Sequence, residues 1–353
     1  MRSVRALSFH STYKCLNSGV CCSSGWEVAV EEPVEANLRP RLLAVAAALP
    51  NGPDGFVPAQ DPPAGCGSVF RLHEQSGACW FRDDAAGLCA LHRELGEEAL
   101  PSACRQFPRA CVLEPGTVSV SLSHYCPTAA ALLFREGPGF RIVEEPPAFP
   151  SSWPFEGLDA TQAYPPLLRP GVLLGLEGLR AFEVGAIEVL AEGDLWMALR
   201  RIVHAAETSR QWTPEGGPLR ELIGNAFADS SGEPEPSLSD PGTILRASAA
   251  TGSTNLPTLP EFKGHRPRIS APVDLAIRRY VAARLIASWI MFLADDLATV
   301  TRYLRLCVDT VFLFESAQPA SAGAQKRWLE AIRQADLWIL HHCDPDLLAR
   351  NLG

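Results

Sequence analysis

The chain has 353 residues, of which 47% are hydrophobic, and a formal net charge of −9 at pH 7. A chain of this length and apolar content buries a sufficient core without cross-links. Its acidic balance argues against nucleic acid as the main partner, because contacts to phosphate need a basic surface.

The N-terminal sequence MRSVRALSFHSTYKC has no apolar stretch of signal-peptide length. The longest apolar tract, residues 281–293, is interrupted by Arg284 and is too short to cross a bilayer. We therefore expect a cytoplasmic protein with no membrane partner. Cytosolic thiols stay reduced, so a cysteine cluster there binds metal more often than it forms disulfides.

Residues 1–137 are the cysteine-rich part of the chain. We expect helices over residues 34–48 and 87–100, a short alternating strand over 118–122, and a helix that begins at Pro127. Seven prolines in residues 146–170 rule out regular structure there and indicate a domain boundary.

The remaining sequence is predicted in three parts. Residues 138–211 are a linker followed by helices, over 179–190 and from Asp194 to about residue 208. Residues 212–269, rich in Gly, Pro, Ser and Thr, are expected to be a flexible insertion. Residues 270–353 are a helical domain, with helices over 272–294 and 297–314, a third around Trp328 and Trp338, and a short last one after Asp344. The predicted fold is thus mainly α: an irregular, metal-organised N-terminal module and a C-terminal helical domain.

Nine of the 11 cysteines precede residue 127. Thiolates bind zinc or iron–sulfur clusters, and four sulfurs usually complete a site. The candidate ligands are Cys15, Cys21, Cys22, Cys79, Cys89, Cys104 and Cys126, with Cys66 and Cys111 in reserve. Side chains of adjacent residues point apart, so the Cys21–Cys22 pair favours a polynuclear cluster over one compact tetrahedral ion. Counting cysteines does not decide between zinc and an iron–sulfur cluster.

Three stretches carry a resemblance to a known family: CLNSGVCCSSGW from Cys15, CWFRDDAAGLCALHRELGEEALPSACRQFPR from Cys79, and the Cys126–Pro127 pair. Together they resemble the CxxCxxCC zinc- or iron-chelating cysteine-cluster family, also called YkgJ-like. LGEEALPSACRQFPR and Trp26 are most similar to its flagellin lysine-N-methylase branch. The resemblance covers about residues 9–136.

This resemblance implies that the seven cysteines are metal ligands of an iron–sulfur cluster (4Fe-4S) or zinc. It also implies S-adenosyl-L-methionine as methyl donor and a flagellin-like protein lysine as acceptor. The family often has another cysteine between the first one and the vicinal pair, whereas residues 16–20 contain none. Cys66 and Cys111 are therefore candidates to complete the ligand set.

Two further features bear on this site. Arg105 and Arg109 either offset the charge of a thiolate centre or pair with Glu97 and Glu98 at the surface. His124 is a candidate ligand or hydrogen-bond donor to a ligand. We expect a protein that binds a metal cluster, iron–sulfur or zinc, which the resemblance implies to be an S-adenosylmethionine-dependent protein-lysine N-methyltransferase. The alternative is a non-enzymatic structural zinc module with a helical partner-docking domain. The sequence contains neither a Rossmann glycine fingerprint nor a CxxxCxxC run, so no motif in it supports a site for S-adenosylmethionine. A measurement of S-adenosylmethionine binding would separate the two functions.

Overall fold

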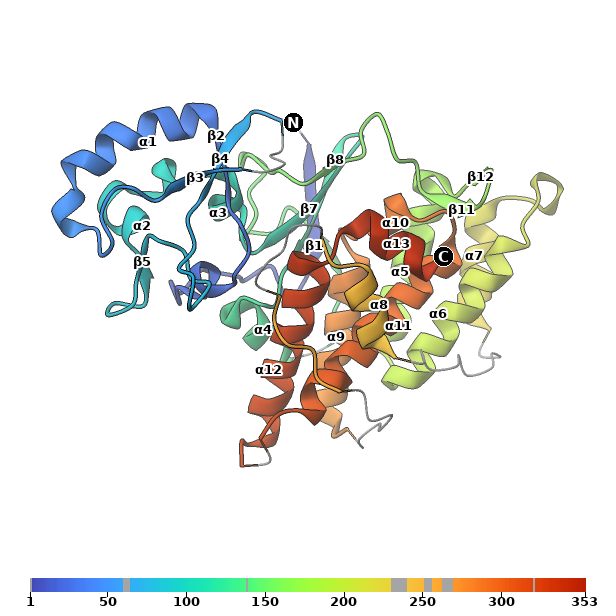
Figure 1. Ribbon diagram of the computed structural model, residues 1–353. Coiled ribbons are helices and arrows are strands. Elements are labelled where there is room, and N and C mark those ends of the chain that lie inside the picture. Colours follow the sequence, from blue (N-terminus) through green and yellow to red (C-terminus); the bar gives the residue numbers. More distant parts are fainter. Residues whose placement is uncertain are drawn as a thin grey trace.

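The computed structural model describes residues 2–59, 64–137, 139–229, 240–250, 256–261, 269–319 and 321–353. The chain is a mixed α/β protein, with 49% of its residues in helices and 14% in strands. The prediction of a mainly α fold is therefore wrong. Figure 1 shows the central strands β1, β7 and β8 between the N-terminal elements on one side and most of the C-terminal helices on the other.

The largest sheet has five strands in the order β10–β7–β8–β1–β9. Their bounds are Ser3–Leu7 (β1), Arg109–Glu114 (β7), Thr117–Leu122 (β8), Ile142–Glu144 (β9) and Leu158–Asp159 (β10). Strands β7 and β8 form an antiparallel hairpin, and β1 lies parallel to β8 and antiparallel to β9. The short β10, from the proline-rich segment, pairs in parallel with β7. The first strand of the chain is thus paired with the end of the cysteine-rich part.

Strand β1 is buried on both faces. Val4 and Ala6 pack on one side of the sheet, whereas Leu7 joins the core under the helices. On the helical side Arg5 is only 3% exposed, and its guanidinium lies 2.7 Å from Glu183 and 3.7 Å from Glu114. A buried arginine is tolerated here because two carboxylates compensate its charge.

The cysteine-rich part has regular structure and a hydrophobic core of its own. Its elements are β2 (Ala29–Glu31), α1 (Glu32–Ala44), β3 (Phe56–Pro58), β4 (Cys66–Phe70), β5 (Arg82–Asp83), β6 (Leu88–Cys89), α2 (Ala90–Leu95) and α3 (Ser102–Gln106). Strands β2, β4 and β3 form an antiparallel sheet, and Leu38, Leu42, Phe70, Phe81 and Leu91 are buried together beside it. The expectation of an irregular module organised by metal is therefore wrong, because apolar burial holds this part together.

The helix predicted over residues 87–100 is wrong in its bounds, because Leu88–Cys89 is strand β6 and α2 covers only Ala90–Leu95 before Gly96. The other helices are α4 (Pro127–Leu133), α5 (Gly175–Ala191), α6 (Leu195–Arg210), α7 (Leu219–Ala228), α8 (Pro241–Ala247), α9 (Ala271–Leu285), α10 (Ile290–Leu293), α11 (Leu297–Ser316), α12 (Ala324–Asp336) and α13 (Pro345–Leu352). A π-helical turn, Leu337–His342, follows α12, and a two-stranded sheet of β11 (Leu167–Arg169) and β12 (Val172–Leu173) precedes α5. The side chains of Asp194, Asp296 and Asp344 accept hydrogen bonds from first-turn backbone amides and so begin three of these helices.

The helix predicted over residues 272–294 is interrupted. Helix α9 ends at Leu285, and Ala287 has a left-handed φ of 58° before α10 begins. The indole N–H of Trp289 donates to the carbonyl of Cys111 on β7 at 3.0 Å. This interruption coincides with a contact between the connecting segment and the sheet.

Part of the predicted flexible insertion, residues 212–269, is helical. Ile223, Ala226 and Phe227 of α7 and Leu245 of α8 are buried in the main core. Residues 230–239, 251–255 and 262–268 lie outside the described residues, so the prediction for them stays a prediction. In the part of the chain that the structure describes, no helix is both long and apolar enough to cross a bilayer.

Candidate functional site

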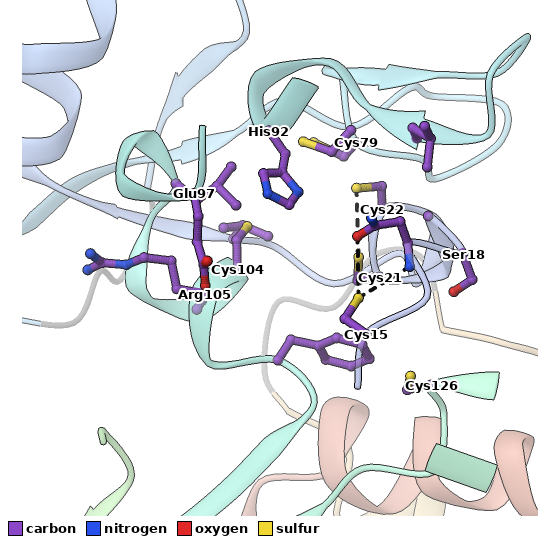
Figure 2. Close-up of a pocket in the computed structure, with 18 of the residues that line it drawn as sticks. Cys15, Ser18, Cys21, Cys22, Cys79, His92, Glu97, Cys104, Arg105 and Cys126 are labelled. Carbon is purple, nitrogen blue, oxygen red and sulfur yellow. Dashed lines mark hydrogen bonds between the residues drawn. The ribbon is translucent and has the colours of Figure 1, made fainter. Parts of the chain in front are cut away.

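All seven cysteines proposed as ligands line one cavity of about 470 Å³. They are Cys15, Cys21, Cys22, Cys79, Cys89, Cys104 and Cys126, and Figure 2 shows most of them around the opening. We call this space the cysteine cavity. Cys66, at the start of β4, and the buried Cys111 on β7 are not among the described residues that line it. The structure therefore brings the seven candidates together and leaves both reserve cysteines elsewhere.

Short local structures present these thiols. Cys21 and Cys22 lie in a 3-10 turn, Val20–Ser23, that begins after Gly19 in a left-handed conformation. The backbone N–H of Cys79 donates to the carbonyl of Cys22 at 2.8 Å, which joins two distant segments at the cavity. Cys89 ends β6 and caps α2, Cys104 lies within α3, and Cys126 caps α4.

Gly19 packs directly against the loop before Cys89. A Cβ atom on Gly19 would lie 1.8 Å from the carbonyl oxygen of Gly87, far inside any real contact. Only glycine permits this approach of the two backbones, and the left-handed φ of 66° favours glycine as well. The contact sets the vicinal cysteines beside Cys89.

Five of the seven thiols lie at the core of the cysteine-rich part, whereas Cys15 is exposed and Cys126 packs elsewhere. Cys22, Cys79, Cys89 and Cys104 pack against the core of the cysteine-rich part, with Cys21 Sγ 4.0 Å from Cys22 Sγ. Cys126 instead packs in the core on one face of the five-stranded sheet, with the hydroxyl of Tyr13 3.8 Å from its sulfur. In Figure 2, Cys126 lies apart from the others, on the side nearer the C-terminal helices.

The Cys22 thiol lies in hydrogen-bond contact with the sulfurs of both Cys21 and Cys89. The hydrogen bond with Cys22 lowers the pKa of Cys21, although burial opposes this shift. The same kind of hydrogen bond lowers the pKa of Cys89 to about 7, and the pKa of Cys22 is raised in return. Cys89 is therefore readily converted to the thiolate that binds metals.

The deeper thiols behave in the opposite way. Burial raises the pKa of Cys79 to about 12 and raises the pKa of Cys104 well above its usual value. The charges of neighbouring cysteines raise both further. Five thiolates cannot share this space at neutral pH without a cation, since each like charge disfavours the next.

The cavity is not arranged for a single metal ion. Among the described residues, no group of three or more His, Cys, Asp or Glu side chains is positioned to hold one. A tetrahedral ion with metal–sulfur bonds of about 2.3 Å needs its sulfurs about 3.8 Å apart. The Cys21–Cys22 separation approaches this distance, but in the part of the chain that the structure describes no set of three ligands meets the requirement.

Cations also line the cavity. Arg93 pairs with Asp83 and Glu94, whereas Arg105 and Arg109 have no carboxylate at ion-pair distance within the described ranges. The predicted alternative, surface pairing of these two arginines with Glu97 and Glu98, is therefore not found there. Arg109 lies over the ring of Trp153 at 4.4 Å instead.

His124 is not among the described residues at the cavity wall, although the sequence suggested it as a ligand. Its ring is fully buried, with Nδ1 3.1 Å from Asp336 and Nε2 3.2 Å from Nε2 of His10. The backbone N–H of His124 also donates to Asp336, at the end of α12. His124 thus anchors the turn that carries Cys126.

The end of α12 and the π-helical turn fasten two cysteine-bearing segments together. His341 stacks on Trp26 with ring centroids 4.2 Å apart and contacts Ser123 Oγ at 2.7 Å. Arg333 donates to the carbonyl of Tyr125 at 3.0 Å. Sequence reasoning missed these contacts, because they join residues about two hundred positions or more apart.

No protein-family model matches this chain, and no solved structure matches it. One similar curated protein is an uncharacterized protein of Methanocaldococcus jannaschii, 26% identical over 117 residues. The match covers 33% of this chain and 36% of that protein, so it spans about a third of the relative's length. The comparisons assign no activity, and the resemblance to the cysteine-cluster family stays a prediction.

Proposed function

We propose that this chain binds a metal cluster in the cysteine cavity. The observation that supports the proposal is the convergence of seven thiols from six separate segments on one space of about 470 Å³. Cys66, Cys111, Cys307 and Cys343 are not among the described residues that line it, so the convergence selects the cysteines of the proposed ligand set. All 11 cysteines are free thiols in this structure, as expected of a cytoplasmic protein, which we propose it to be.

An iron–sulfur cluster of the 4Fe-4S type suits this arrangement better than lone zinc. The inorganic atoms of a cluster lie between its cysteine sulfurs, so those sulfurs stand farther apart than around one ion. The lack of a compact three-residue site among the described residues agrees with that requirement. A bound cluster supplies a redox-active or Lewis-acidic centre.

The surrounding residues suit an anionic centre. Arg105 and Arg109, which have no carboxylate at ion-pair distance in the described part of the chain, offset the charge of several thiolates. The hydroxyl of Tyr13 is placed to donate to the sulfur of Cys126. Because the cysteine-rich part has its own apolar core, these residues bind the cluster to a fold that exists without it.

We further propose an S-adenosylmethionine-dependent protein-lysine N-methyltransferase that resembles flagellin lysine methylase. Its substrate would be a flagellin-like protein with a surface lysine. A lysine ammonium must lose a proton before it accepts a methyl group, and Glu97 is the only carboxylate among the described residues that line the cavity. Figure 2 shows Glu97 beside His92 and Cys104. We assign Glu97 as the base that takes this proton.

The test is methyl transfer from labelled S-adenosylmethionine to flagellin by cluster-loaded protein. Glu97→Gln is expected to lower kcat by about a hundredfold or more, since general bases contribute about 10²–10⁴ to rates. Glu98→Gln is the matched control, because Glu98 is the next residue along the chain and is not among the described residues that line the cavity. Loaded protein that neither binds S-adenosylmethionine nor methylates flagellin would leave the non-enzymatic zinc-module alternative in place of the methylase.

A further inference from the structure

A second cavity, of about 210 Å³, lies between the sheet and the C-terminal helices. Its walls come from the start of β7, the end of β8, the α9–α10 connection, the π-helical turn and α13. This volume is far more than the roughly 10–15 Å³ that one enclosed water needs. Trp289 lines the cavity and keeps 38% of its surface exposed, so the wall reaches solvent there.

The wall is largely apolar and contains no acidic side chain among its described residues. Its one fully buried charged group is Arg284 of α9, which is 3% exposed. Ser121 Oγ donates to the carbonyl of Ala283, and Ser123 contacts His341, so both hydroxyls already have partners. The cavity therefore combines apolar surface with one buried cation, Arg284, and with the more exposed Arg109 at its edge with the cysteine cavity.

The guanidinium of Arg284 lacks partners for most of its five N–H donors. One nitrogen donates to the carbonyl of Leu122 at 2.6 Å, and another lies 3.5 Å from Asp336. Nε has no hydrogen-bond partner in the described structure. Asp336 compensates the charge, but its carboxylate also accepts from Tyr280 and from both the backbone and the ring of His124, and it leaves Arg284 Nε without a partner in the described structure.

Ser288 is a second buried donor at the same cavity. It is 7% exposed, and its hydroxyl has no partner among the described residues. A buried donor without a hydrogen bond destabilises a protein. The Arg284 Nε–H and the Ser288 hydroxyl are two such donors in one cavity wall, and together they indicate an acceptor from outside the chain.

We propose that this cavity binds a small molecule with an apolar body and a single carboxylate. The carboxylate accepts hydrogen bonds from Arg284 and Ser288, and the apolar body lies against the aliphatic wall and Trp289. An amine is disfavoured because a second cation would face Arg284. The two cavities share only Phe107 and Arg109 among their described lining residues, so this proposal stands whether or not the cysteine cavity holds a cluster.

Hexanoate is the probe, measured by calorimetry and by thermal unfolding on the full-length protein as purified. It is expected to bind with a stoichiometry of one and to raise Tm in a saturable manner. Hexylammonium, with the same apolar length and the opposite charge, is expected to do neither. Ser288→Leu fills the cavity and removes the hydroxyl, and should weaken hexanoate binding at least about tenfold.

Ser209→Ala is the matched control, since Ser209 is a buried serine with a partner, the carbonyl of Ala205 at 2.6 Å. This variant should lose stability and keep hexanoate affinity. Ser288→Ala should keep or gain stability and lose affinity, which separates binding from folding if Ser288→Leu fails to fold. No binding of hexanoate to the wild type, equal binding of hexylammonium, or unchanged affinity in Ser288→Ala would each overturn the proposal.

Discussion

Replacing Gly19 by alanine should disrupt the cysteine cavity more than the same change at Gly87. Both glycines have a φ of 66°, so alanine at either costs about 1–2 kcal/mol of backbone strain. A Cβ on Gly87 has no neighbour within 4 Å among the described residues, whereas one on Gly19 lies 1.8 Å from the Gly87 carbonyl oxygen. Relieving that overlap costs a further 1–3 kcal/mol or so, the usual range for overpacking.

The free energy of unfolding, measured by urea titration, should therefore fall by about 1–2 kcal/mol in Gly87→Ala and about 2–5 kcal/mol in Gly19→Ala. The accessibility of Cys21 and Cys89 to a thiol reagent should rise in Gly19→Ala alone, because the two loops separate. Equal losses of stability and equal thiol reactivity in the two variants would refute the claim that this backbone contact positions the vicinal cysteines.

Three other changes test the rest of the structure. Asp336→Asn leaves the buried Arg284 uncompensated and should cost about 3–5 kcal/mol in urea unfolding, whereas Asp159→Asn at the surface should cost little; equal effects would contradict the buried network. Burial lowers the pKa of His341 to about 3, so between about pH 3 and pH 6.5 this histidine is protonated in the unfolded chain and neutral in the folded one. The contribution of His341 to the free energy of unfolding is therefore complete above about pH 6.5 and falls by about 1.4 kcal/mol by pH 5.5. Urea unfolding should show that His341→Gln loses about 1.4 kcal/mol less stability than the wild type over this pH range. An equal loss in the two proteins would count against the burial of His341. A metal chelator should leave the far-ultraviolet circular dichroism nearly unchanged, because the cysteine-rich part has its own core; loss of its secondary structure would show that metal organises it after all.

The helices could be predicted from the sequence, because their signals are local. Asp194 caps α6, and proline at the first position begins α4 and α13. The grouping of seven cysteines could also be predicted, from the density of cysteines before residue 127 and from the resemblance to the cysteine-cluster family. Both signals act over a few residues or depend on residue type alone.

The sheets could not be predicted, because their strands carry little periodicity. Strand β1 is buried on both faces, with Val4 and Ala6 on one side and Arg5 on the other, so apolar and polar residues do not alternate by exposure. Its partner β8 lies more than a hundred residues away, and β10 has only two residues. Pairing over such distances is decided by tertiary contacts and not by local preference.

The contacts that complete the candidate site could not be predicted from the sequence either. Asp336 anchors the turn at His124, and His341 stacks on Trp26. Asp336 and His341 belong to the predicted helical domain, in which no motif indicates a contact with the cysteines. Only the folded chain brings them together.

The most direct measurement is the absorption spectrum and the iron, sulfide and zinc content of protein purified without oxygen. Our account predicts a brown protein that absorbs broadly in the near-ultraviolet and visible and bleaches with dithionite. Cys89→Ser should lose this absorbance, whereas Cys307→Ser, on the buried α11, should keep it. Colourless, folded protein with less than about a tenth of an equivalent of metal would contradict the proposed cluster.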